Sequence, residues 1–217
     1  MKMGREDTDT LIEQLAGELH PVRAMRFREG LGWLSLALTV TLAMVLVWLG
    51  IRSDVMAGHL SPLFLISQGL FLILGLAAGT TTLVMANPNV GNRHDGWKWA
   101  LAMGMLLPAA AIIIAIVNMA HQPAFYIPEH DIYCLVHGLG FGALTAVVLT
   151  FWLRRGAPAS PEQAGLLAGI ASGALGVFAY AFSCAFDSIY HVGFWHAIPV
   201  AIAGTIGRLV IPPLIRW

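Results

Sequence analysis

Six long stretches of predominantly apolar residues constrain this chain more than any other feature of its sequence. A helix that crosses about 30 Å of hydrocarbon needs about 20 such residues, because it must satisfy its own backbone hydrogen bonds where there is no water. The stretches of this length comprise residues 31–51, 62–86, 99–119, 132–153, 164–183 and 194–215. The sequence therefore predicts an all-α, polytopic membrane protein with six transmembrane helices.

The composition favours a membrane protein over a soluble one. Hydrophobic residues make up 58% of the 217 residues and charged residues 11%, whereas a soluble domain carries about 25% charged residues. The formal net charge is zero, so no overall field favours nucleic acid as a direct partner. The breaks between the stretches are short, which predicts an antiparallel bundle. No small-residue cleavage site follows the first stretch, so we expect the N-terminal segment to persist.

The distribution of Lys and Arg predicts the orientation of the helices, because short loops rich in these residues stay in the cytoplasm. If both termini are cytoplasmic, Arg52 alone lies outside, Arg208 lies within the last helix, and the other ten of the 12 cationic residues lie inside. These ten are Lys2, Arg5, Arg23, Arg26, Arg28, Arg93, Lys98, Arg154, Arg155 and Arg216. We therefore expect a multi-pass protein of a bacterial inner membrane with both termini cytoplasmic.

Glycines recur four residues apart within several predicted helices. Gly138 and Gly142 lie in the fourth, and Gly165, Gly169 and Gly173 lie in the fifth. Small residues at this spacing let helix backbones approach closely. We expect them to pack the bundle internally, with a dimer interface as the alternative.

Both cysteines and most histidines fall near the predicted outer face. One group of donor side chains, at i, i+4 and i+7 near the start of the fourth predicted helix, consists of His130, Cys134 and His137. These three share one helical face. A second group, at i, i+3 and i+7 after the fifth predicted helix, consists of Cys184, Asp187 and His191. The second group also shares a face if this turn is helical.

Two thiols at one predicted depth support two chemistries. They can form a disulfide that makes oxidation a signal. Alternatively, with the histidines and Asp187, they can bind zinc, cadmium or copper, which a disulfide cannot do. A constitutive disulfide, or inert thiols beside solvated histidines, is the remaining interpretation. Of the other outer histidines, His59 and His196 have the weakest case as ligands.

Residues 8–20 have the pattern of a short amphipathic helix. Its apolar positions are Leu11, Ile12, Leu15 and Leu19. Thr10 followed by Glu13 fits a capping box at the start, and Pro21 disfavours continuation of the helix. The polar face is acidic, which suits a protein groove with basic rims better than anionic lipid. Packing on the cytoplasmic ends of its own bundle is the alternative.

These features together resemble the NrsF-type anti-sigma factors over nearly the whole chain. The resemblance includes the amphipathic segment that ends in Leu19-His20-Pro21-Val22-Arg23 and the lone cysteines that head the fourth helix and close the fifth. It also includes the loop Trp152-Leu153-Arg154-Arg155-Gly156-Ala157-Pro158 and the final Arg216-Trp217. The resemblance implies a regulator, not an enzyme.

What the resemblance implies divides the chain in two. Residues 1–30 are expected to bind an extracytoplasmic-function sigma factor and hold it inactive, through Leu11, Ile12, Leu15, Leu19 and Val22. Residues 31–217 are expected to form a six-helix transmembrane sensor. Cys134 and Cys184 match the cysteines through which the family senses oxidative or heavy-metal stress. Ligation of zinc or another soft metal ion by the histidines rests on their spacing alone.

Two other classes of function are alternatives to a regulatory role. A membrane redox or cofactor-binding protein would hold haem between histidines or exchange thiols with a quinone. Haem ligation favours facing histidines deep within the spans, whereas these cluster at one boundary, and quinone-linked oxidases use paired cysteines. A metal transporter needs ionisable groups at mid-depth, and the predicted spans contain almost none.

Overall fold

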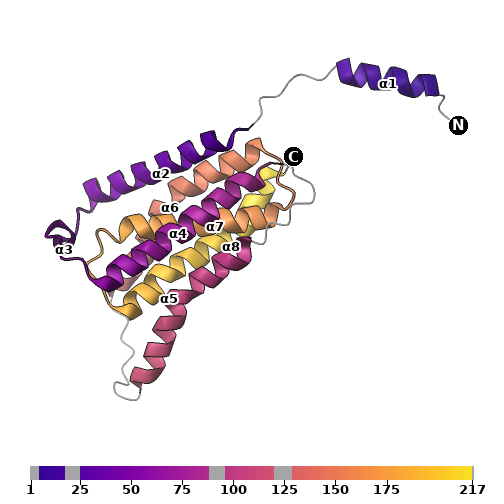
Figure 1. Ribbon diagram of the computed structural model, residues 1–217. Helices are drawn as coiled ribbons and strands as arrows, with labels where there is room; N and C mark the ends of the chain where they lie inside the picture. The colour runs from indigo at the N-terminus through magenta and orange to yellow at the C-terminus, as the bar shows by residue number, and fades with distance from the viewer. Residues whose placement is uncertain (1–4, 18–24, 88–95, 120–128, 217) are drawn as a thin grey trace.

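The computed structural model describes residues 5–17, 25–87, 96–119 and 129–216. Helices and short connections make up this part of the chain, and no strand occurs in it, so the prediction of an all-α fold is confirmed. In chain order the elements are α1 (Arg5–Gly17), α2 (Phe27–Trp48), α3 (Ser53–Met56), α4 (Pro62–Met85), α5 (Gly96–Met119), α6 (Glu129–Arg155), α7 (Pro161–Tyr180), the π-helical segment η1 (His191–His196) and α8 (Ala197–Ile215). The long helices form a bundle, and α1 lies apart from it (Figure 1).

Five helices in the described ranges are long and apolar enough to cross a membrane. They are α2, α4, the Ile132–Arg155 part of α6, α7, and the continuous stretch His191–Ile215 formed by η1 and α8. The helix α5 coincides with the third predicted span, but its apolar stretch among described residues, Lys98–Ala110, is shorter. Each predicted span therefore coincides with a helix, and five of these helices meet the length and composition of a membrane span.

The helix α7 lies at the centre of the bundle, buried along almost its whole length. It packs against α4, α6 and α8, and glycines make the closest approaches possible. A Cβ added at Gly176 would lie 2.5 Å from the backbone nitrogen of Gly142 on α6. One added at Gly169 would lie 2.7 Å from the backbone carbon of Ala203 on α8. The predicted internal packing of the glycines is thus confirmed at these crossings.

The two ends of the bundle differ in their contacts. At one end, the indole of Trp152 near the end of α6 donates to the carbonyl of Leu83 near the end of α4, 3.3 Å away. Arg154 and Arg155 complete α6 at this end. At the opposite end, the backbone N–H of Arg52 donates to the carbonyl of Phe182 after α7, over 3.0 Å. Arg52 is thus separated from the cationic end of α6, as the predicted orientation requires.

The connection between α2 and α4 is more structured than the sequence indicated. Gly50 and Gly58 adopt φ values of 80° and 73°, which other residues rarely adopt, and the short helix α3 lies between them. The helix α4 then begins at a strong start signal, because the Ser61 hydroxyl accepts from the Phe64 N–H and Pro62 occupies the first turn. This connection borders the candidate site described next.

Candidate metal and thiol site

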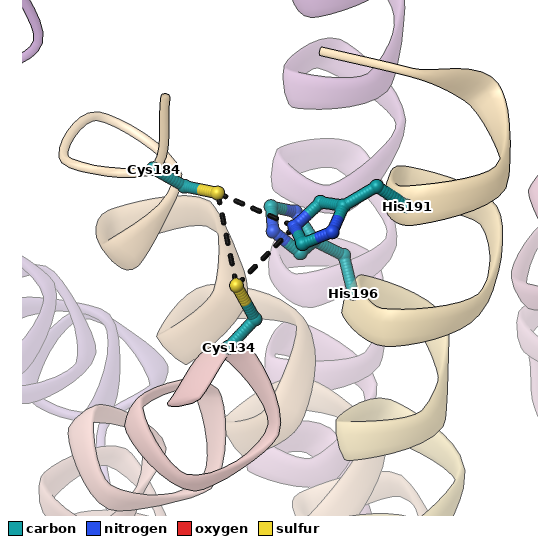
Figure 2. A group of neighbouring side chains, drawn as sticks. All are labelled: Cys134, Cys184, His191 and His196. Atoms are coloured by element: carbon teal, nitrogen blue, oxygen red, sulfur yellow. Dashed lines mark hydrogen bonds between the residues drawn. The ribbon is translucent and has the colours of Figure 1, made fainter. Parts of the chain in front are cut away.

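Two sulfurs and two imidazoles converge at the end of the bundle where α6 begins (Figure 2). Cys134 lies in the second turn of α6. Cys184 lies in the non-helical connection after α7, and His191 and His196 are the first and last residues of η1. Three separate parts of the chain therefore supply one cluster, which we call the Cys-His quartet.

The donor atoms of the quartet are in close contact. The two sulfurs are 3.7 Å apart, and no disulfide joins them. The Nε2 atom of His191 lies 3.2 Å from the sulfur of Cys134 and 3.4 Å from that of Cys184. The rings of His191 and His196 have centroids 5.2 Å apart. One ligand atom from each residue falls within 4.8 Å of all the others.

The unusual winding of η1 brings its two histidines to the same side. In an α-helix, residues five apart point about 140° away from each other, because each residue turns the helix by about 100°. A π-helix bonds residues five apart and so places them on one face. The backbone N–H of His191 is also held in place, because it donates to the Ser188 hydroxyl over 3.1 Å. This local geometry aims both imidazoles at the cysteines.

The quartet is sealed from solvent, since its four residues are between 2% and 5% exposed. The pKa of the Cys184 thiol is lowered, first by its hydrogen bond with Cys134 and further by one with His191, although burial acts in the opposite direction. Both ring nitrogens of His196 are buried and have no hydrogen-bond partner among the described residues. An imidazole in this state retains its capacity to bind a ligand.

The donor set fits a tetrahedral soft cation. Zinc binds thiolate at about 2.3 Å and imidazole at about 2.0–2.1 Å, so a tetrahedral centre separates two sulfurs by about 3.8 Å and sulfur from nitrogen by about 3.6 Å. The observed separations of 3.7 Å, 3.2 Å and 3.4 Å are close to these values. Two thiolates also neutralise a divalent charge, which favours such an ion in a buried site. Among the described residues, the group that could hold a metal is therefore Cys134, Cys184, His191 and His196.

The structure brings only some of the predicted site residues into the quartet. The turn after α7 is not helical, yet Cys184 and His191 meet because the connection returns to the bundle at η1. Asp187 instead accepts from the Ser61 hydroxyl. The ring of His137 stacks on Tyr180 at 5.1 Å, and its Nδ1 lies 2.7 Å from the Tyr133 carbonyl.

Two further histidines that the sequence places near the outer face are His130 and His196. The side chain of His130 lies outside the described residues. His196 was among the weakest ligand candidates, yet it belongs to the quartet. Its spacing of five from His191 matches neither α-helix nor strand periodicity, so no periodic signal could have identified it.

Three of the five predicted partner-binding residues lie on α1. Leu11, Ile12 and Leu15 are exposed at 44%, 58% and 56%, and α1 is drawn apart from the bundle in Figure 1. Leu19 and Val22 lie outside the described residues. The described apolar face of α1 is therefore available to another molecule.

Comparison with known proteins gives a consistent family. The family described as NrsF, negative regulator of sigma F, matches residues 15–217. The chain is 26% identical to the "Probable anti-sigma-F factor NrsF" of Azospira oryzae, over 99% of this chain and all of the relative. It is 27% identical to the "Anti-sigma-F factor NrsF" of Caulobacter vibrioides, over 97% of this chain and 99% of the relative. No solved structure matches the chain. The chain therefore belongs to the NrsF family of anti-sigma factors, which are regulators and not enzymes.

Proposed function

We propose that this protein is a membrane-bound anti-sigma factor that sequesters an extracytoplasmic-function sigma factor and releases it when the Cys-His quartet binds a soft metal ion or is oxidised. Membership of the NrsF family supports the regulatory role. The convergence of four donor atoms within 4.8 Å supports the sensing role and is the observation on which the proposal depends.

In the proposed topology, the protein crosses a bacterial inner membrane six times, with both termini in the cytoplasm. The five apolar helices of sufficient length support this topology, and α5 supplies the sixth span. The cationic residues support the orientation, because Arg154 and Arg155 end α6 at the opposite end of the bundle from Arg52. The quartet then lies buried at the periplasmic end of the bundle, where metal ions and oxidants arrive first.

The N-terminal segment, residues 1–30, is the proposed binding site for the sigma factor, and residues 31–217 form the sensor. The exposed apolar residues Leu11, Ile12 and Leu15 support a helix-in-groove mode of binding. Leu19 and Val22 extend the same apolar pattern in the sequence. Asp9 and Glu13 on α1 add negative charge, which favours a groove with basic rims.

Two kinds of stress act on the same sulfurs. Zinc or cadmium would take both thiolates and both imidazoles, with release of the thiol protons. Hydrogen peroxide would instead join the sulfurs in a disulfide: the two thiols give up two protons and two electrons, and the hydrogen peroxide is reduced to two molecules of water. The sulfurs then shorten their separation from 3.7 Å to about 2.05 Å. Disulfide formation therefore draws α6 toward the connection that follows α7, whereas a metal ion fixes the two at about their present separation.

The test uses the full chain in detergent, bound to the sigma factor that co-purifies from its native host. Zinc or cadmium is added, and release of the sigma factor is measured by size-exclusion chromatography. We expect release from the unmodified protein, and we expect none from Cys134→Ser or Cys184→Ser. His59→Ala is the matched control, because His59 is exposed outside the quartet. Unchanged release from either cysteine variant would contradict the sensing role.

A further inference from the structure

Hydrogen bonds join the connection between α2 and α4 to residues on both sides of Cys184 in the chain. Before the cysteine, the Ser183 hydroxyl donates to the Gly50 carbonyl, and the Phe182 carbonyl accepts from the Arg52 N–H over 3.0 Å. After it, Asp187 accepts a hydrogen bond from Ser61. A displacement of Cys184 is therefore transmitted to this connection by hydrogen bonds, without passing through the centre of the bundle.

Arg52 makes the central contacts between this connection and the residues around Cys184. Its side chain is only 7% exposed, and its Nε and Nη2 atoms donate to the two carboxylate oxygens of Asp54, each over 2.6 Å. The same Nη2 lies 3.7 Å from the carboxylate of Asp187, and the guanidinium lies over the Phe64 ring at 5.0 Å from its centroid.

The charges around Arg52 favour its ionised form. Burial acts to lower the pKa of Arg52, but the hydrogen bond with Asp54 and the charges of Asp187 and Asp54 raise it overall. A bidentate, partly buried guanidinium fixes the geometry of its partners more firmly than an exposed ion pair does. Arg52 therefore ties Asp54 on α3 and Phe64 on α4 to Phe182 and Asp187, which lie on either side of Cys184 in the chain.

The connection leads directly to the N-terminal segment through α2. This helix packs on the bundle along one narrow stripe, and its remaining residues are mostly exposed in the structure. The stripe consists of Gly30, Leu34, Ala37, Thr41 and Val45. At the far end of α2, a Cβ on Gly30 would meet the Trp152 ring at 2.8 Å, so a shift of this helix must rearrange a tight contact.

We propose that Arg52 is the positioning residue that couples the Cys-His quartet to α2 and thereby to the sigma-factor-binding segment. This proposal rests on the proposed function, because it assigns the route by which a change at Cys184 reaches the N-terminal segment. When Cys184 moves, Phe182 and Asp187 move with it, and their contacts with Arg52 displace the end of α2. The link from Arg52 to Asp187 requires the guanidinium, which is not one of the four donor groups of the quartet.

The experiment separates coupling from cation binding in the full chain bound to its sigma factor. Zinc affinity is measured by competition with a chelating dye, and zinc-dependent release is measured on the same samples. For Arg52→Gln we expect unchanged zinc affinity, unchanged binding of the sigma factor before zinc is added, and at least about a fivefold loss of release. Arg52→Lys keeps the charge without the bidentate fork and should restore part of the release.

The controls make each outcome decisive. Arg208→Gln removes an arginine that lies 3.7 Å from Glu162 and is 57% exposed, and it should leave release unchanged. If Arg52→Gln does not fold, as judged by its melting temperature, Asp187→Asn carries the same test. Normal release from the Arg52 or Asp187 variant overturns the coupling, and so does a parallel loss of zinc affinity and release. Failure of the unmodified protein to release the sigma factor overturns the proposed function instead.

Discussion

Gly176 lies where α7 crosses α6, and replacing it with alanine changes the spacing of these helices while leaving every ligand of the quartet in place. A Cβ at this position would lie 2.5 Å from the nitrogen of Gly142 and 2.7 Å from its Cα. Ordinary contacts of a Cβ begin at 3.4 Å. Because the obstacle is backbone, and the Gly138 carbonyl oxygen lies closer still, the helices must separate by at least the difference, 3.4 − 2.5 = 0.9 Å.

This separation is large for a metal centre. Gly138, on the same crossing, lies one helical turn after Cys134, so α6 carries the cysteine away from Cys184. Metal-ligand distances tolerate only about 0.2 Å, so we expect zinc to bind at least about tenfold more weakly. Forced overpacking costs about 1–3 kcal/mol, and the better helix propensity of alanine offsets about 0.5–1 kcal/mol of it. A net loss of about 1 kcal/mol lowers the melting temperature by about 2–4 °C for a chain of this size.

The assay compares Gly176→Ala with Gly140→Ala. Gly140 lies on α6, and a Cβ there would meet nothing within 4 Å, so its alanine variant should bind zinc normally and melt no lower than the unmodified protein. Both variants are purified in one detergent, melted with tryptophan fluorescence as the signal, and titrated with zinc against a chelating dye. Equal melting temperatures and equal zinc affinities for the two variants would refute the reasoning.

Two further predictions concern the quartet and α1. His196→Leu removes a buried imidazole without a hydrogen-bond partner among the described residues, a state that costs about 1–3 kcal/mol. The zinc-free variant should therefore melt no lower than the unmodified protein in a thermal scan, while a dye competition shows weaker zinc binding. A lower melting temperature together with an unchanged zinc affinity would contradict a ligand role for His196. Leu15→Glu should weaken sigma-factor binding about tenfold or more in a titration, whereas Gln14→Glu, the same new charge one residue earlier, should not; equal affinities would exclude Leu15 from the interface.

The helices could be predicted from the sequence because apolar length is a direct physical requirement. A segment without water around it must satisfy its backbone internally, so stretches of about 20 apolar residues coincide with α2 and α4 through α8. The ends differ by a few residues, as for α2, which begins at Phe27 instead of residue 31. The fold of the connection between α2 and α4 depends on Gly50, Gly58 and contacts with Phe182, which no local pattern specifies.

The site was only partly predictable for a related reason. Periodicity and topology place Cys134, Cys184 and His191 at one end of the bundle, and the structure brings these three together. The aromatic neighbour Tyr180, against which His137 stacks, is distant in sequence, so the orientation of His137 could not be inferred. The position of His196 depends on the π-helical winding of η1, which no periodic pattern in the sequence indicates.

The near-complete burial of the quartet has a consequence for the timing of any response. All four donor residues are at most 5% exposed, so an ion can enter or leave only when the surrounding helices open for a moment. Exchange limited by such openings is slow compared with diffusion. A bound cation would then stay in the site after a brief rise in its concentration had ended. Occupancy of the site would report past exposure to the cation and not its present concentration.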